Sequence, residues 1–152
     1  ARTREGENLR ADILSHLDKI EEYMHRIDER IPEIEKALRE KLHDKICSII
    51  GDMSEKASVN IDDDRLNIEV VYYVERACIA EETVRMASHI KAMRAEIESA
   101  VNIGKKMDFM VQEMNREINT IGSKSSDFDI ASIVIAVKSE IEKIREQIQN
   151  VE

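Results

Sequence analysis

Apolar residues recur three or four positions apart along almost the whole chain, which is the spacing of one face of an α-helix. The first such stripe has charged residues between its members. At a rise of about 1.5 Å per residue it predicts about 60 Å of amphipathic helix, whose apolar face needs a partner helix. Its members are Leu9, Ile13, Leu17, Ile20, Met24, Ile27, Ile31, Ile34, Leu38, Leu42, Ile46 and Ile49.

Two features interrupt this long arm. Pro32 removes a backbone donor and biases Ile31 away from helical geometry, so we expect a kink or a helix restart there. Residues 51–61 lose the periodicity and gather Gly, Ser and Asn, which predicts a reversal between two long antiparallel helices. The acidic run 62–64 then indicates a helix N-terminus, where carboxylates interact favourably with the helix dipole.

The second half of the chain predicts three more helices. The first runs from residue 62, through the strand-prone letters VVYYV, to a point before Gly104. The next covers residues 105–121 and closes at Gly122, and the last starts near Ser126, which forms a capping pair with Asp129. The stripes that carry these helices are Ile79, Met86, Ile90, Met93, Ile97; Met107, Met110, Val111, Met114, Ile118, Ile121; and Ile130, Ile133, Val134, Val137, Ile141, Ile144, Ile148.

The fold class predicted from this pattern is all-α, with a long antiparallel helical hairpin, a shorter helix and a C-terminal helix. We divide it into an arm with its connecting loop, residues 1–61, and a helical domain, residues 62–152. Composition agrees, because 4 Gly and 1 Pro among 152 residues are too few for the turns of an all-β fold. The start at Ala1, without Met, suggests a piece of a longer protein.

Composition also narrows the function classes. No run of about 18 uncharged apolar residues occurs and the N-terminus lacks a signal-peptide pattern, so we expect a cytoplasmic protein. Cys47 and Cys78 have no metal-knuckle spacing and are interpreted as reduced structural thiols. The formal net charge of −9 argues against a simple nucleic-acid coat, so any phosphate chemistry has to be local.

Candidate chemistry first appears between residues 79 and 100. Glu82, Arg85, His89 and Glu96 fall along one line of a helix, beside the apolar stripe. Imidazole and carboxylate together can bind Mn²⁺ or Zn²⁺ or act as acid and base, which makes Glu82 and His89 the most ligand-like pair. An ordinary surface row of paired charges has the same spacing. The other histidines, His16, His25 and His43, are expected at solvent-exposed positions.

The helix at 105–121 offers a second pair of carboxylates. Glu113 and Glu117, four residues apart, can reach one divalent ion, although this spacing also occurs on many solvated helices. Phe109 lies on the polar side of the same helix, which suggests that both faces are covered by a neighbouring helix or subunit. A platform on which a base stacks is the alternative.

Basic residues gather locally between residues 101 and 126. Lys105, Lys106, Arg116 and Lys124 outnumber the three acidic residues there, so this stretch tolerates a polyanion. Residues 122–126 add hydroxyls and backbone donors next to a helix start, which suits phosphate, although a plain linker has the same composition.

The segment GKKMDFMVQEMNREINTIGSKSSD and the last helix to EIEKIREQIQNVE resemble the C-terminal domain of the YicC/YloC family of bacterial endoribonucleases. The resemblance extends upstream through RLNIEV and IAEETVRMASHI, so residues 62–152 fit the family pattern and the arm fits its helical middle region. At Cys78 family members usually place Asp, which could cap a new helix. Family members carry an additional N-terminal domain of comparable size, which we expect to be missing from this 152-residue chain.

The resemblance implies a metal-dependent endoribonuclease that assembles as a hexamer around RNA. Glu82, His89, Glu113 and Glu117 are the hypothesised ligands of Mn²⁺ or Mg²⁺, with Glu82, His89, Glu113 and Arg116 as the catalytic group. The hypothesised RNA-binding residues are Arg85, Lys105, Lys106, Arg116, Asn119, Ser123 and Lys124. Two alternatives remain: a helical oligomerisation scaffold without catalytic activity, and a part that holds the site but cannot cut alone.

Overall fold

The structure is a computed structural model that describes residues 2–57, 63–99 and 104–151, and these residues form five α-helices and no strand. The helices are α1 (Arg2–Ala57), α2 (Asp63–Ala77), α3 (Ala80–Ser99), α4 (Lys105–Lys124) and α5 (Phe128–Val151). The predicted all-α fold class is confirmed. None of the described helices has the length and apolar composition needed to cross a membrane.

The chain divides into two compact units. The first comprises Ala1–Glu29 together with Ile79–Glu152, and the second comprises Arg30–Cys78. The N-terminal half of α1 therefore belongs to the first unit and its C-terminal half to the second. The candidate site lies in the first unit alone.

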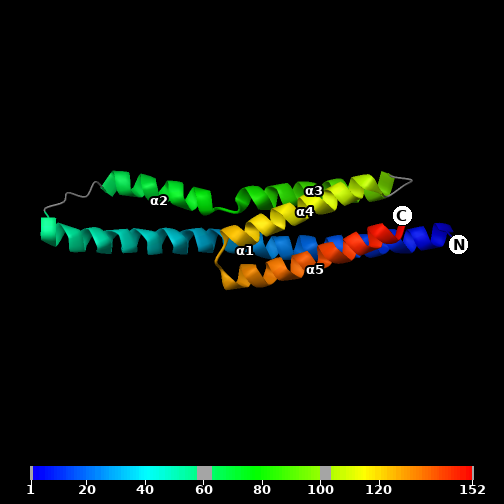
Figure 1. Ribbon diagram of the computed structural model, residues 1–152, viewed down its shortest axis with the longest axis horizontal. Coiled ribbons are helices and arrows are strands. Elements are labelled where there is room, and N and C mark those ends of the chain that lie inside the picture. Colours follow the sequence, from blue (N-terminus) through cyan, green and yellow to red (C-terminus); the bar gives the residue numbers. More distant parts are fainter. Residues whose placement is uncertain (1, 58–62, 100–103, 152) are drawn as a thin grey trace. The chain divides into compact units, whose positions relative to one another are not determined.

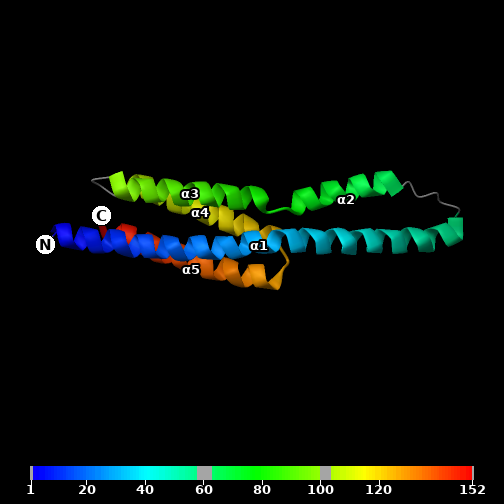
Figure 2. The ribbon, with the colours of Figure 1, turned by 180° about the vertical axis from the view of Figure 1, so that it is seen from behind.

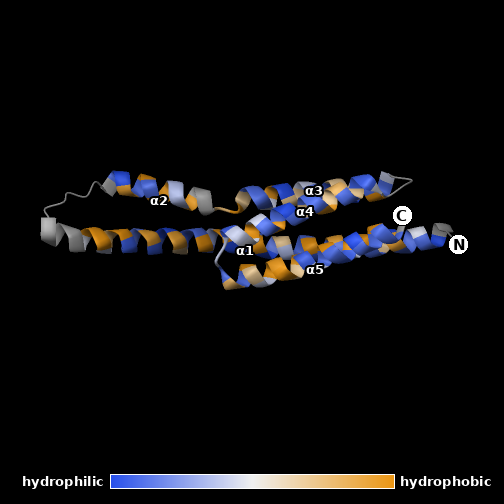
Figure 3. Cartoon of the chain, viewed as in Figure 1, coloured by the Kyte–Doolittle hydropathy of each residue, from blue (hydrophilic) through white to orange (hydrophobic). Residues whose placement is uncertain are grey.

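In the first unit, α3, α4, α5 and the N-terminal half of α1 lie alongside one another, as Figures 1 and 2 show from opposite sides. Hydrophobic and hydrophilic residues alternate along these helices with helical spacing (Figure 3). The predicted stripes form the core, apart from Leu9 and Met110, which are only half-buried. Its buried members include Ile13, Leu17, Ile20, Ile27, Met86, Ile90, Met93, Ile97, Met107, Val111, Met114, Ile118, Ile121, Ile130, Val137, Ile141, Ile144 and Ile148.

Polar contacts also tie α1 to its neighbours in this unit. His16 Nδ1 lies 2.5 Å from Glu140 Oε2 on α5, and Arg94 of α3 donates to Asp18 Oδ1 at 2.6 Å. The expected exposure of His16 is therefore wrong, since only 13% of its side chain is accessible. A buried carboxylate on the neighbouring helix supplies the partner that lets this imidazole leave water.

In the second unit, α2 runs back along the C-terminal half of α1 (Figures 1 and 2). Leu66, Val70 and Val74 are buried and pack against residues of α1, which confirms a helix through VVYYV. The facing residues of α1 are Leu38, Leu42, Ile46 and Cys47. They are only partly buried because a single partner helix cannot cover the whole stripe.

Two predictions about the arm need correction. The helix does not restart at Pro32, because α1 continues through it, and the alternative of a kink there stays a prediction. Ile31 and Ile34 are both half-buried, so the stripe keeps its register across Pro32. The segment predicted to reverse the chain, residues 51–61, is helical as far as Ala57. The structure does not describe residues 58–62, which include Asp62 and the predicted domain boundary at 61.

The predicted second long helix is broken at Cys78 and Ile79. The carbonyl of Ile79 accepts the first hydrogen bond of α3, from Thr83 N at 3.1 Å, and the Thr83 hydroxyl donates to Ala80 O at 2.9 Å. The Cys78 thiol donates to Glu35 Oε1 of α1 at 2.9 Å, within the second unit. This position is therefore occupied by a residue that bonds to α1 rather than by a helix cap.

The junction of α4 and α5 also differs from its prediction. Gly122 does not close α4 but lies inside it, where a Cβ would come within 3.2 Å of Val134 Cγ1 on α5. The helix ends one turn later, with Ser125 N donating to Ile121 O at 3.1 Å. Asp127, not Ser126, caps α5, because its Oδ2 accepts from Ile130 N at 3.1 Å.

Candidate metal centre

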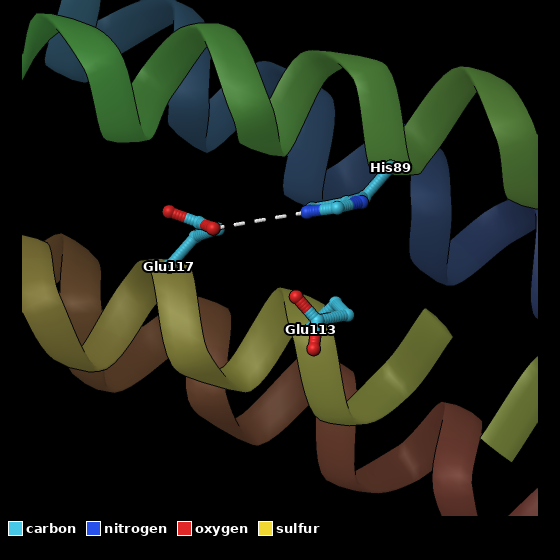
Figure 4. Close-up of side chains that lie close together, drawn as sticks. All are labelled: His89, Glu113 and Glu117. Atoms are coloured by element: carbon cyan, nitrogen blue, oxygen red, sulfur yellow. Dashed lines mark ion pairs between the residues drawn. The ribbon is translucent and has the colours of Figure 1, made fainter. Parts of the chain in front are cut away.

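Three potential metal ligands face one another between α3 and α4. His89 projects from α3, and Glu113 and Glu117 project from consecutive turns of α4 (Figure 4). One ligand atom of each residue lies within 4.8 Å of the others. The four-residue spacing on α4 places both carboxylates on the face that packs against α3.

One ring nitrogen of His89 makes no hydrogen bond to the described residues. Its Nε2 lies 3.8 Å from Glu117 Oε1, too far for a hydrogen bond, and is buried without a hydrogen-bond partner among the described residues. A buried polar nitrogen without a partner costs free energy unless a ligand completes it. An imidazole and two carboxylates are a donor set that suits Mn²⁺ and similar cations, so the residues fit a metal.

Glu117 is buried and held in place by a guanidinium. Arg85 Nε donates to Glu117 Oε2 at 3.0 Å, which leaves Glu117 Oε1 on the side of His89. The hydrogen bond to Glu117 raises the pKa of Arg85 above its ordinary value. Carboxylates that hold metal ions are typically oriented by such a second hydrogen bond.

Glu82 lies outside this group of three. Its Oε1 accepts from Lys124 Nζ at 2.7 Å and from Arg85 Nη2 at 3.3 Å. Burial raises the pKa of Glu82, but the hydrogen bond from Lys124 and the two positive charges outweigh it, and the pKa is lowered overall. The structure thus places the fourth hypothesised ligand against two cations instead of with His89, Glu113 and Glu117.

Comparison with known proteins decides the family. The chain matches the family described as "Endoribonuclease YicC-like, C-terminal" over residues 27–152. It belongs to the YicC-like endoribonuclease family. The resemblance drawn from the sequence is thereby confirmed.

Two relatives of this YicC-like chain are named "Probable endoribonuclease YicC". The relative from Clostridioides difficile (strain 630) is 44% identical over 151 residues, which is 99% of this chain and 50% of the relative. The relative from Haemophilus influenzae (strain ATCC 51907 / DSM 11121 / KW20 / Rd) is 36% identical over 151 residues, again 99% and 50%. The chain therefore spans about half the length of these relatives.

The hypothesised RNA-binding residues fall into two groups in the YicC-like chain. Arg85 and Lys124 are bound to the buried carboxylates described above. Lys106 Nζ lies 3.4 Å from Glu96 Oε2, and the Ser123 hydroxyl donates to Thr120 O at 3.0 Å. The remaining three are exposed on α4: Lys105, Arg116 and Asn119.

The predicted phosphate-gripping loop is mostly helix. Residues 122–124 form the last turn of α4, so their backbone donors belong to helical geometry, and only residues 125–127 connect to α5. Two aromatic residues nearby are open instead: Phe109 is 62% exposed and Phe128, which the sequence pattern did not single out, is 82% exposed. The prediction that a neighbouring helix of this chain covers Phe109 is wrong, because it lies on the outer face of α4.

Proposed function

We propose that the chain supplies the metal-binding part of an endoribonuclease that cleaves RNA phosphodiesters. One observation carries the proposal: His89, Glu113 and Glu117 of a YicC-like chain converge to within 4.8 Å around a buried imidazole nitrogen that lacks a hydrogen-bond partner among the described residues. The names of the relatives supply the reaction class.

A divalent cation is the group that completes this arrangement, and Mn²⁺ or Mg²⁺ is proposed. The His89 nitrogen favours Mn²⁺ over Mg²⁺, because Mg²⁺ prefers ligands that are all oxygen. When bound, such a cation would neutralise charge on a phosphodiester and lower the pKa of a water molecule. The chain's own contribution is to hold Glu117 by its bond to Arg85 and to keep the carboxylates of α4 one turn apart.

Cationic side chains near the cluster are proposed to bind the RNA backbone. Arg116, which precedes Glu117 in α4, is exposed, and its guanidinium is proposed to stabilise negative charge that develops on phosphate. Lys105 and Lys106 lie at the other end of α4 and are proposed to contact phosphates further along the strand.

Cleavage and metal binding by matched variants test this proposal. In the full-length protein, Glu117→Gln, Glu113→Gln and His89→Ala should each lower the rate of RNA cleavage at least about 100-fold. In the present chain, the same variants should weaken Mn²⁺ binding measured by calorimetry, whereas Glu98→Gln, on the exposed side of α3, should do neither. Full cleavage activity in Glu113→Gln and His89→Ala would exclude the site.

A second candidate function is that of an assembly module for the parent protein. We propose that the parent protein acts in the cytoplasm as a homo-oligomer, and the family resemblance implies a hexamer. The supporting observation is that α2 exposes Ile68, Val71 and Tyr72 as well as burying its other face. A stable oligomer in light scattering without any metal-dependent change would favour this candidate. Retention of metal binding by the monomeric chain would favour the nuclease site.

A further inference from the structure

Glu82 is the most deeply buried ionisable side chain next to the metal cluster, with 2% of the residue exposed. A carboxylate in such a place needs compensating partners, and two cations supply them to a single oxygen. Lys124 reaches it from the end of α4 and Arg85 from the next turn of α3. The other oxygen, Oε2, is buried and has no hydrogen-bond partner among the described residues.

Arg85 joins this carboxylate to the cluster. Its guanidinium donates to Glu82 through Nη2 and to Glu117 through Nε, so Glu82 and Glu117 flank one cation. The side chains of Arg85 and Lys124 remain 49% and 32% exposed. Their charged ends are thus held by a buried anion, while both side chains stay partly accessible to solvent beside the cluster.

We infer that Glu82 is a positioning residue, which holds Arg85 and Lys124 side by side so that the pair binds a phosphate of the RNA strand next to the cluster. This inference rests on the proposed function, since the ligand is the RNA of that same site. A guanidinium and an ammonium group on adjacent helices offer a phosphodiester a planar fork and a point charge together.

The contacts of Glu82 Oε1 disfavour a direct role of this oxygen as a metal ligand. Its Oε1 already accepts two charged hydrogen bonds, and a divalent ion there would lie against the ammonium group of Lys124. Repulsion between like charges in a partly buried place is large compared with repulsion in water. A metal ion is better accommodated on the far side of Arg85, where Glu117 Oε1 faces His89.

Comparison of Glu82→Gln with its matched control Glu81→Gln separates the effect of positioning the cations from the effect of removing one negative charge. Both substitutions remove one negative charge from the same turn of α3, but the Glu81 side chain is 83% exposed and only approaches Arg85 Nη1, at 3.6 Å. Removing negative charge favours RNA, so Glu81→Gln should leave affinity unchanged or raise it. Glu82→Gln should lower affinity at least about threefold, because the two cations lose the anion that orients them.

RNA affinity is measured on the 152-residue chain with a fluorescent single-stranded RNA, at low salt and in EDTA, so that the result does not depend on a bound metal. Binding by Glu82→Gln as tight as that by Glu81→Gln overturns the inference, and so does the absence of RNA binding by the unsubstituted chain. Thermal unfolding establishes that both variants are folded.

A double-mutant cycle with Lys124→Ala tests whether Glu82 acts on RNA binding through Lys124. Lys124→Ala alone should lower RNA affinity, and Glu82→Gln should add much less to that loss than it causes by itself, because both changes disrupt one pair. Fully additive losses would overturn the inference. If Glu82→Gln does not fold, an unchanged RNA affinity in Lys124→Ala overturns it.

Metal affinity distinguishes failure of this inference from failure of the proposed function. Glu82→Gln should bind Mn²⁺ within about threefold of the unsubstituted chain, whereas Glu117→Gln should lose at least about tenfold. An equal loss in Glu82→Gln would make Glu82 a ligand and overturn the positioning role. An unchanged Mn²⁺ affinity in Glu117→Gln would reject the proposed metal centre. The positioning role of Glu82 would then be tested by the RNA affinities measured in EDTA alone.

Discussion

Among single residues, the buried carboxylate Glu140 should make the stability of the first unit sensitive to acid. Burial raises its pKa, but hydrogen bonds from His16 and Lys143 outweigh burial and lower the pKa below the ordinary value of 4.5. A carboxyl group with a lowered pKa in the folded state contributes stability above its unfolded pKa, and this contribution is lost as the pH falls through the folded value.

The corresponding test is Glu140→Gln, which we expect to lower the free energy of unfolding at pH 7 by about 1–3 kcal/mol. The loss should shrink as the pH falls below about 4.5, because the unsubstituted protein then gives up the same interaction. Urea unfolding at several pH values measures both effects. Glu142→Gln, an exposed change of the same charge on α5, should leave the curve nearly unchanged, and equal effects of the two changes would contradict this account.

The candidate site was only partly predictable from individual residues. Helical spacing puts Glu113 and Glu117 on one face of α4, and it puts Glu82 and His89 on one line of α3. Which carboxylate meets the imidazole depends on how α3 and α4 are aligned lengthwise, and this alignment is set by packing of the two stripes. Arg85 lies between Glu82 and His89 on α3 and can bond to carboxylates of either helix. No spacing in the sequence predicts which carboxylates it contacts.

For the helical elements, the hydrophobic stripes predicted what is buried, but local signals placed the ends less well. The stripe of α5 is buried throughout, because its period agrees with the helix that forms. Gly122 looked like a C-terminal signal, yet it lies inside α4, at a point that α5 approaches closely. Cys78 looked compatible with a continuous helix, yet the helix breaks there and the thiol donates to Glu35, which is distant in sequence.

Gly51 and Gly122 lie in helices with different surroundings, which gives a matched pair of substitutions. A Cβ at Gly51 would meet nothing within 4 Å, so Gly51→Ala should stabilise the chain by about 0.5–1 kcal/mol through helix propensity. A Cβ at Gly122 would press on Val134 Cγ1 at 3.2 Å, so Gly122→Ala should lose that gain or destabilise the chain.

Thermal and urea unfolding of both alanine variants measure the difference. In a Val134→Ala background, Gly122→Ala should recover the stabilisation seen at Gly51, because the opposing methyl group is gone. Equal gains at both glycines in the parent chain would show that Val134 moves aside without cost, and would contradict a tight approach of α4 and α5.

For the whole molecule, a net charge of −9 means that RNA is repelled by most of the surface. The region around the cluster does not reverse this, because its carboxylates outnumber its cations. The carboxylates are those of Glu81, Glu82, Glu113 and Glu117, and the cations are Arg85 and Lys124. A divalent cation at the proposed site would bring this group close to neutrality, so metal and RNA should help each other to bind.

We therefore expect Mn²⁺ to tighten the binding of a short RNA protected by 2′-O-methyl groups by about 5-fold to 150-fold, the usual range for coupled sites. Coupling between two ligands is reciprocal, so saturating RNA should tighten Mn²⁺ binding by the same factor. Fluorescence anisotropy measures the first quantity and calorimetry the second. In Glu117→Gln the response of RNA affinity to Mn²⁺ should largely disappear, because the buried ligand that couples the ion to Arg85 is changed. RNA affinity that does not respond to Mn²⁺ in the unsubstituted chain would mean that the acidic cluster and the RNA surface act separately.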